Sequence, residues 1–562
     1  MITYKILIIF LFIALNCLAQ PNAEIQNLAA DFFEWRKITQ PSTEDDILRV
    51  ERPDGWVPDF SPEELERNKR RYIEYSTLLK NLPGENWSRS DSVDFLLMHS
   101  AIERVNWELN VLRSPYRNPD FYVHQTVGAV YELLLIHSPM TDERMKNIII
   151  RLRSIPLTIE HAKQNLAEPV EPFAQVALEN LSDIRNRLNK MRDGLLQITD
   201  KRYEAELTES VNAAANALKE FKNWIELNRL KMNKSFSIGR ENYIYFLRNI
   251  ALMTYSPEEL LQMGKSEWNR SVSFELFERE RNAGLPGLMI FSSAAEQILQ
   301  ERIYEEEIRK FLVDKNLMSV PDWVQHYINK NIPPHIEPFT NMGVVDDLTS
   351  ETRLDEDGVS YIPEPSLKMS YFRLATAKDP RPIIIHEGVP GHYFQMVLSW
   401  ANPNPIRRRF FDSGSNEGIG FYVEELLLQY GLFDDSPRTR EIIYNFMRLR
   451  ALRVDVDINL ALDNYNIEDA GKYLASTVPM DLATGIDEAR FFAYNPGQAI
   501  TYQIGKLQIL NLIADAKVLL GDKFDLKDYH DYMMQNGNVP IALQRWEYLG
   551  LKDEVEKLWP QN

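Results

Sequence analysis

Apolar residues recur every three or four positions along most of the chain after Gln20, a spacing that places them on one face of a helix. The spacing is most regular, with few internal glycines or prolines, in segments 172–198, 201–231, 256–281 and 291–314. The charged residues between them are expected to form the solvated faces of the same helices. The pattern predicts a mainly α fold, with one large helical domain built as two lobes around a cleft.

The clearest helix start lies in SPEELERNKRRYIEYSTLLKNL, which begins at Ser61. Ser61 is a favoured N-cap residue, Pro62 suits the first helical position, and Glu64 stands where the carboxylate of a capping box belongs. We therefore expect this helix to begin at Pro62.

One region, residues 332–382, breaks the helical pattern. NIPPHIEPFTNMGVV is rich in proline and irregular, whereas GVSYIPEP and LKMSYFRLAT favour strands separated by turn residues. We expect a small β-sheet here. Two roles are open for it: a strand edge that holds an extended peptide by backbone hydrogen bonds, or a structural hairpin that covers the core.

The composition narrows the class of partner. The 562 residues are 44% hydrophobic and 26% charged, as in a folded protein rather than a disordered one. The formal net charge of −19 repels phosphate backbones and anionic lipids, so neither nucleic acid nor a lipid surface is an expected partner. A peptide or another small substrate remains open.

The first twenty residues, MITYKILIIFLFIALNCLAQ, have the layout of a secretory signal peptide. Lys5 precedes an apolar stretch, 6–15, and Ala19 offers a cleavage site, so residues 1–19 are the predicted signal and 20–562 the mature domain. The alternative is a membrane anchor, although the stretch is short for a span of about 20 residues. We expect an exported protein, periplasmic or extracellular, with no stable membrane span in the mature chain.

Cys17 is the only cysteine and lies inside this segment. Lipid attachment there is a minor alternative, because Leu15 and Asn16 precede it where a lipoprotein signal usually has small residues. After cleavage behind Ala19 the mature chain would hold no disulfide and no thiol ligand. Any metal would then be bound by His, Asp or Glu.

Such ligands gather in IIIHEGVPGH, residues 383–392, which contains His386, Glu387 and His392. The chain has only nine histidines, so a His-Glu pair followed closely by another histidine is uncommon by chance. A capping His-Glu pair with an incidental second histidine is the alternative. In a regular helix, residues six apart point about 240° apart, so these two imidazoles could not share one ion.

The residues between the histidines answer this objection. Pro390 disfavours helix at Val389, while Gly388 and Gly391 permit unusual backbone angles and close approach. The sequence therefore predicts a bulge or break that turns the second imidazole back toward the first.

A hydrolytic metal site usually has three protein ligands and one open position. Glu417, in SNEGIGFYVEELLLQYGLF, is the best third candidate, because a carboxylate at the start of a largely apolar helix needs a partner. Capping of the helix dipole is the other explanation for Glu417. Glu424 follows two turns later and could support an imidazole from behind. Mixed His and Glu ligands suit Zn²⁺ but leave other transition metals open.

Four motifs, HEGVPGHYFQ, NEGIGFYVEE, RLRALRVDVD and PGQAITYQIGKLQI, together resemble the bacterial family known as domain of unknown function 885. That family looks like a group of gluzincin-like zinc metallopeptidases, distantly similar to the thermostable carboxypeptidase and oligopeptidase clans. The resemblance extends over nearly the whole mature chain. It implies a single helical zinc-peptidase-like catalytic domain, with a cleft and a small β-sheet near the active site.

The resemblance also implies roles for single residues. His386 and His392 match the two histidine ligands of its His-Glu-x-x-Pro-Gly-His motif, Glu387 matches the general base, and Glu417 matches the expected third ligand. The other matching positions, in an Arg-x-x-Arg-x-x-x-Asp pattern and a Pro-Gly-Gln-x-x-x-Tyr-x-x-Gly segment, are Arg450, Arg453, Asp457, Tyr502 and Gly505.

Two positions depart from the family pattern. Relatives often have a histidine where this chain has Tyr393, and usually have one where it has Ala461. If the missing histidines contact substrate in relatives, this chain differs in specificity or rate. The ligands and the base are intact.

In such a site Glu387 would take a proton from a zinc-activated water and pass it to the leaving amine. The oxyanion then needs a donor. Tyr502 is the first choice, because its phenol follows a Pro-Gly turn, and Arg490 is the second, or could instead hold a substrate carboxylate. An ordinary core position is the competing explanation for Tyr502. For Arg453 and Asp457 we favour an intrahelical ion pair over a catalytic role.

The expected function is that of a secreted or periplasmic zinc metallopeptidase. A non-catalytic peptide-binding homologue and a zinc amidohydrolase acting on non-peptide amides are the alternatives. The sequence leaves open the peptide sequence, internal or terminal cleavage, and the oligomeric state.

Overall fold

The structure is a computed structural model that describes residues 22–42, 50–84 and 87–559. These residues form a mainly α-helical fold with one small sheet, so the predicted fold class is confirmed. None of the described helices combines the length and the apolar character that a membrane crossing requires. The expected signal peptide, residues 1–19, lies outside the described residues.

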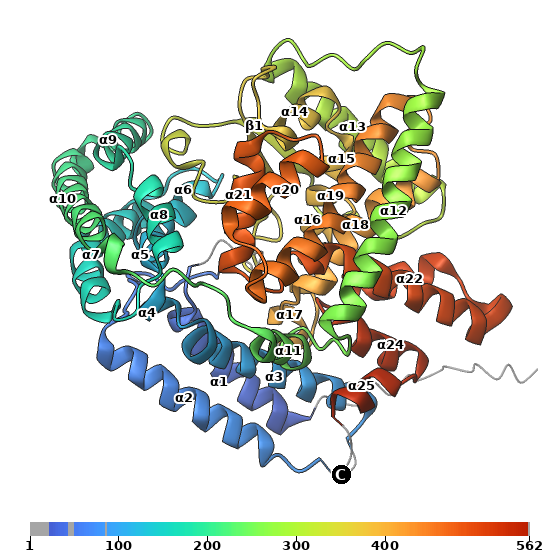
Figure 1. Ribbon diagram of the computed structural model, residues 1–562, viewed down its shortest axis with the longest axis horizontal. Helices are drawn as coiled ribbons and strands as arrows, with labels where there is room; N and C mark the ends of the chain where they lie inside the picture. The colour runs from blue at the N-terminus through green and yellow to red at the C-terminus, as the bar shows by residue number, and fades with distance from the viewer. Residues whose placement is uncertain (1–21, 43–49, 85–86, 560–562) are drawn as a thin grey trace, which may run out of the picture.

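The N-terminal helices form the blue-to-green part of the molecule, along the left and lower sides of Figure 1. They are α1 Ala23–Thr39, α2 Pro62–Lys80, α3 Arg89–Asn106, α4 Ser114–Arg117, α5 Pro119–Val123, α6 Ala129–Leu135, α7 Asp142–Asn165, α8 Glu171–Asn180, α9 Ile184–Leu195, α10 Glu204–Asn228 and α11 Arg240–Asn249.

The remaining helices form the other side of the molecule (Figure 1). They are α12 Pro257–Arg281, α13 Ala294–Asp314, α14 Tyr371–Lys378, α15 Arg381–Ile383, α16 His392–Trp400, α17 Pro405–Arg409, α18 Ser413–Gln429, α19 Pro437–Ala461, α20 Ile467–Thr477, α21 Leu482–Tyr494, α22 Ile500–Leu520, α23 Leu526–Gln535, α24 Ile541–Leu549 and α25 Asp553–Leu558. Helix α24 returns to pack against α3, so the end of the described chain joins the N-terminal helices.

Short turns of other helix types interrupt these elements. The π-helical turns are Trp107–Leu112, His124–Gly128 and Ile384–Gly388, and the 3-10 turns are Lys201–Tyr203, Arg229–Lys231, Glu337–Phe339 and Gly521–Lys523. The π-helical turn at Ile384–Gly388 carries the His-Glu pair.

Three of the four long helical segments are confirmed as α10, α12 and α13. The fourth, 172–198, is divided into α8 and α9, because Asp183 adopts a left-handed conformation with φ of 49°. Ser61 caps α2 as predicted by accepting the Glu64 N–H at 3.2 Å. The reciprocal half of the capping box is missing, because the Glu64 carboxylate pairs with Arg67 at 2.7 Å instead.

The sheet has the strand order β1-β3-β2, with β1 Tyr327–Asn331, β2 Asp346–Asp347 and β3 Gly358–Ile362. Strand β3 pairs in parallel with β1 and antiparallel with β2. The strand predicted in GVSYIPEP is confirmed as β3, whereas the one predicted in LKMSYFRLAT is wrong.

The segment LKMSYFRLAT forms most of α14 instead of a strand. The rings of Tyr371 and Phe372 pack on Phe446 of α19, with centroids 5.7 and 5.6 Å apart. Packing of these aromatic side chains on a neighbouring helix outweighs their local preference for a strand.

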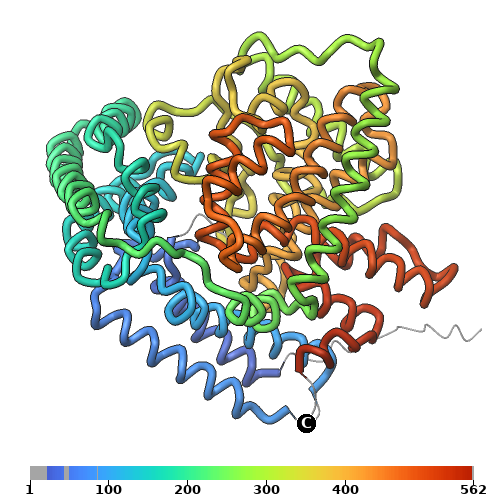
Figure 2. The backbone as a smooth tube through the Cα atoms, in the orientation of Figure 1, coloured from blue at the N-terminus to red at the C-terminus, as the bar shows by residue number. Residues whose placement is uncertain are grey.

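The two largest hydrophobic cores belong to different parts of the sequence. One is formed mainly by the N-terminal helices and includes Phe32 and Leu218, and the other lies in the C-terminal half and includes Ile385 and Phe421. A cavity of about 420 Å³ is lined by residues from both parts. Segments far apart in sequence thus line one cavity. Figure 2 shows the path of the backbone, with the N-terminal part in blue and the C-terminal part in orange and red.

Candidate metal centre

The break predicted between the two histidines is confirmed. The Val389 N–H donates to the carbonyl of Ile384, five residues back, at 3.0 Å, which closes the π-helical turn. The chain then leaves the helix, with Val389 extended and the Val389–Pro390 peptide bond cis, and α16 begins at His392.

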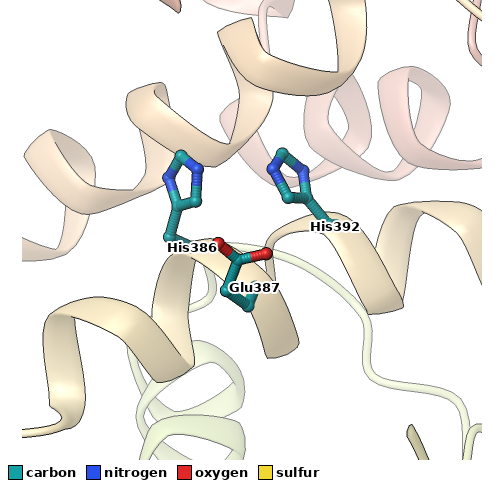
Figure 3. Close-up of side chains that lie close together, drawn as sticks. All are labelled: His386, Glu387 and His392. Atoms are coloured by element: carbon teal, nitrogen blue, oxygen red, sulfur yellow. The ribbon is translucent and has the colours of Figure 1, made fainter. Parts of the chain in front are cut away.

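Gly391 folds the start of α16 back onto the π-helical turn. A Cβ at this position would lie 1.8 Å from the carbonyl oxygen of His386, so only glycine fits without a backbone shift. The close approach brings the imidazoles of His386 and His392 together, with ring centroids 4.6 Å apart. Figure 3 shows the two rings side by side, with the carboxylate of Glu387 next to them.

Glu417 of α18 meets both imidazoles. Its Oε2 lies 3.3 Å from Nε2 of His386 and 3.4 Å from Nε2 of His392. All three side chains are buried, and this Oε2 accepts no hydrogen bond from any described residue. Three possible metal-ligand atoms, the two Nε2 atoms and Oε2 of Glu417, therefore come together from three segments.

Helix capping does not explain Glu417. It lies in the second turn of α18, and the N-cap is Asp412, whose side chain accepts the Ser415 N–H at 2.7 Å. Gly420, one turn after Glu417, leaves the space that the imidazoles occupy. A Cβ there would lie 2.9 Å from Cε1 of both His386 and His392.

A second carboxylate, that of Glu387, also lies near the histidines. Ligand atoms of His386, Glu387 and His392 lie within 4.8 Å of one another. The shorter distances and the deeper burial belong to Glu417, whereas Glu387 is half-buried and borders the cavity. Glu417 is therefore the better third ligand, and Glu387 stands where it can reach a molecule inside the cavity.

Glu424 contacts the opposite side of the His386 ring. Its Oε1 lies 2.7 Å from Nδ1 of His386 and 2.8 Å from Nη2 of Arg450, whose Nη1 donates to Oε2 at 3.1 Å. A carboxylate on Nδ1 fixes the imidazole so that Nε2 faces His392 and Glu417. Sequence reasoning gave Arg450 no role, because its partners come from other helices.

The carboxylates of Glu417 and Glu424 stabilise positive charge on the histidines of the candidate site. Burial and Arg450 act to lower the pKa of His386, but the neighbouring carboxylates of Glu417 and Glu424 raise it to about 10. Burial acts to raise the pKa of Glu417, but His392 and His386 hold it well below its usual range. The same negative charge would stabilise a bound cation.

Tyr502 of α22 borders the same cavity. Its ring is nearly parallel to that of His386, with centroids 6.3 Å apart. The guanidinium of Arg453 lies 4.7 Å from the centre of the Tyr502 ring and is held by Glu488 at 2.6 and 2.7 Å.

Arg453 and Asp457 do not form the predicted intrahelical ion pair. Asp457 instead accepts hydrogen bonds from the N–H groups of Gly497 at 2.8 Å and Ile500 at 3.2 Å. It thereby holds the turn before α22, the helix that carries Tyr502. Its charge points to the backbone of another segment, which i, i+4 spacing could not reveal.

Arg490 is not part of this arrangement. Its guanidinium pairs with Glu179 at 2.7 Å and with Asp487 at 3.3 Å, and the residues that line the cavity do not include it. The predicted set thus separates: His386, Glu387, His392, Glu417, Glu424 and Tyr502 lie together, and Arg490 does not.

The two departures from the family pattern also lie outside the cavity lining. Tyr393 is buried in the C-terminal core, where its ring packs against Gly358 of β3. Ala461 is buried at the end of α19. In this chain, neither position presents a side chain to the cavity.

Comparison with known families matches residues 45–276 and 302–546 to the family described as "Bacterial protein of unknown function (DUF885)". These ranges make up most of the chain and include every residue of the site. The chain belongs to this family. No curated protein matches this DUF885 member.

Two solved structures share the fold of this DUF885 protein. A candidate lipoprotein of unknown function from Shewanella oneidensis is 15% identical, with a TM-score of 0.70 over 94% of this chain and 99% of that one. A candidate lipoprotein from Colwellia psychrerythraea is 17% identical, with a TM-score of 0.73 over 96% of this chain and 100% of that one. At these identities the likeness concerns the fold alone.

Replacement of Gly391 by alanine should destabilise the protein. The added Cβ would press on the carbonyl of His386, so we expect a loss of about 2–4 kcal/mol in the free energy of unfolding, measured with urea. Gly287→Ala is the control, because no described atom lies within 4 Å of its added Cβ. Equal losses in the two variants would contradict the tight contact at Gly391.

Asp457 should give the stability a distinct pH dependence. Burial raises its pKa to about 7, against the lowering effect of backbone N–H groups and Tyr243. An acid whose pKa is raised on folding stabilises the protein while protonated, and this contribution is lost as the pH rises through about 7. Asp457→Asn imitates the protonated form. The stability of wild type relative to this variant should therefore fall between pH 5 and pH 8, and a constant difference would contradict the raised pKa.

Proposed function

We propose that this protein is a zinc-dependent metallopeptidase. The observation that carries the proposal is the buried Oε2 of Glu417, which faces two imidazole Nε2 atoms at 3.3 and 3.4 Å and has no hydrogen-bond partner among the described residues. Two imidazole nitrogens and one carboxylate oxygen that lie this close together in a buried place can all serve as ligands of one metal ion. The donor set of two histidines and one glutamate is one that zinc peptidases use.

Under this proposal His386, His392 and Glu417 would hold the ion. Zinc bound there would activate a water molecule and polarise the substrate carbonyl. Glu424 and Arg450 keep the His386 ring in the orientation that binding needs. These side chains are buried and border the cavity, so water would reach the ion from the cavity.

Glu387 is the proposed general base. It adjoins the ligand His386 in sequence, lines the cavity and is half-buried, so its carboxylate can reach both the pocket and the ligand atoms. It would take the proton of the attacking water and deliver it to the nitrogen of the leaving amine. Tyr502 borders the same space and would donate its hydroxyl hydrogen to the carbonyl oxygen as negative charge develops.

The cavity supports a peptide as substrate. Its volume of about 420 Å³ lies in the range of ligand sites, and its lining includes both residues of β2 and the three that follow, Leu348 to Ser350. An extended segment beside Glu387 would be enclosed on several sides. Whether it is cut internally or near an end is left open by this proposal.

An exported location fits the same proposal. Residues 1–19 have the layout of a secretory signal, and two solved structures with this fold are described as candidate lipoproteins. We therefore propose a periplasmic or extracellular protein. An exported protein anchored by a lipid on Cys17 is the alternative.

Metal content and turnover should separate the roles of the two glutamates. The purified mature chain should bind one equivalent of zinc by elemental analysis, and Glu417→Gln should lose most of it because a neutral amide is a poor ligand. Glu387→Gln should retain the metal and lose hydrolysis of a peptide library. A chelator should abolish activity, and zinc should restore it.

Four results would contradict parts of this proposal. Less than one equivalent of zinc after supplementation would remove the metal site. Full hydrolysis by Glu387→Gln would remove the base. Zinc binding with cleavage of simple amides but of no peptide would favour the amidohydrolase, and zinc binding without any turnover would favour a binding protein.

Tyr502→Phe should lower kcat by about a hundredfold and leave zinc content and KM nearly unchanged, because its hydroxyl would act only as charge develops on the oxygen. Steady-state kinetics on the best library peptide measures the split. Tyr393→Phe is the matched control, since that phenol lies in the core, and it should keep kcat within about twofold. Equal effects of the two changes would assign Tyr502 a packing role.

A further inference from the structure

The cavity that borders the candidate metal centre also borders two arginines from the N-terminal part of the chain, Arg52 in the segment between α1 and α2 and Arg151 in α7. Both guanidinium groups pack against the indole ring of Trp56, with Cζ atoms 4.3 and 4.9 Å from the ring centre. Stacking on an aromatic ring restricts a guanidinium to one plane. The two cations are therefore fixed in place before any ligand arrives.

Among the described residues, backbone carbonyls accept more hydrogen bonds from these two guanidinium groups than carboxylates do. Arg52 donates to the carbonyls of Lys37 at 2.8 Å and Gln40 at 2.6 Å, and Arg151 donates to the carbonyl of Ala129. These bonds orient the side chains but leave their charge in place. The Nε of each arginine has no hydrogen-bond partner among the described residues.

One carboxylate lies close to this pair. Glu132 is 3.2 Å from Nη1 of Arg151, whereas no ion pair with a described residue involves Arg52. Burial and the repulsion of Arg151 lower the pKa of Arg52 to about 10, against the attraction of Glu132. Among the described residues, the guanidinium groups of Arg52 and Arg151 thus have one nearby carboxylate, that of Glu132, on this part of the cavity wall.

Arg353, the third arginine of the cavity, is different. Asp347 binds it through both oxygens, at 2.7 and 3.0 Å, and Glu356 adds a contact at 3.0 Å. Its charge is neutralised by the protein itself. Among the described residues that line the cavity, the arginines without such a bidentate carboxylate partner are Arg52 and Arg151.

We propose that Arg52 and Arg151, stacked on Trp56, form a subsite for a carboxylate of the substrate. The inference rests on the proposed peptidase function and names its substrate class, namely peptides that carry a negative charge in the part that the cavity holds. A free C-terminus and an aspartate or glutamate side chain offer the same group. Paired guanidinium donors in a partly enclosed cavity suit this group better than a neutral amide.

The test uses zinc-loaded Glu387→Gln protein, which should bind peptides without cutting them. Three probes are titrated by calorimetry: N-acetyl penta-alanine with a free C-terminal carboxylate, its C-terminal amide, and the amide with one alanine replaced by aspartate. We expect at least one acidic probe to bind about tenfold more tightly than the neutral amide. Preference for the first acidic probe assigns a C-terminus, and preference for the second assigns an acidic side chain.

Arg151→Gln and, separately, Arg52→Gln should raise the Kd of the preferred acidic probe about tenfold and change that of the neutral amide less than twofold. Arg153→Gln is the matched control, because Arg153 lies on the same helix but is half exposed and pairs with Glu206 at 2.6 Å. It should change none of the three affinities. The less buried Arg52 provides the readout if the Arg151 variant does not fold.

Equal binding of acidic and neutral probes, binding of none at millimolar concentration, or equal loss of all three in the arginine variants would overturn the subsite. Zinc content, measured on the same samples, keeps the two proposals apart. If zinc does not bind but the acidic preference persists in the zinc-free protein, the peptidase proposal fails and the subsite stands. If zinc binds and the preference is absent, only the subsite fails.

Discussion

Two buried carboxylates on one face of α18, two turns apart, impose the main requirement on the surrounding helices. A carboxylate removed from water needs positive charge or hydrogen-bond donors around it, because the desolvation cost is several kcal/mol. Glu424 obtains them from Arg450 and His386. Glu417 contacts Nε2 of His386 and of His392 through its Oε2, and this oxygen accepts no hydrogen bond from a described residue. The interrupted helix at Val389 is needed because both imidazoles must reach this one oxygen.

Helix α19 supports the site from behind through three charged residues on successive turns. Arg450 holds the carboxylate that orients His386, Arg453 lies on the ring of Tyr502, and Asp457 holds the backbone turn that starts the helix of Tyr502. Each acts on a different segment, and none reaches another on its own helix. The close approach of α18 to α22, where a Cβ on Gly505 would lie 2.1 Å from the carbonyl of Gly414, completes the placement of Tyr502.

What could be predicted from the sequence follows from how local each cause is. The break at Val389 depends on neighbouring glycines and a proline, so it could be predicted, as could the helices that start at Ser61 and Ser256. The strand expected around Tyr371 failed, because a ring packed on a distant helix outweighed local preference. The same limit applies to the charged residues. The Arg453–Asp457 pair was assigned by spacing along one helix, whereas the partners of both residues come from other segments. Arg490 was expected at the site, but it pairs with Glu179 of α8.

The cavity shows why both parts of the chain are needed. The C-terminal half contributes the carboxylates of Glu387 and Glu417, and the N-terminal part contributes Arg52 and Arg151 to the same space. The proposed metal ligands and base and the proposed carboxylate subsite thus come from different parts of the sequence. A ligand that fills the cavity would contact both parts. The net charge of −19 is a poor guide to the ligand of this protein. The two arginines proposed to select an anion line a cavity, and a sum over the whole chain does not reveal them.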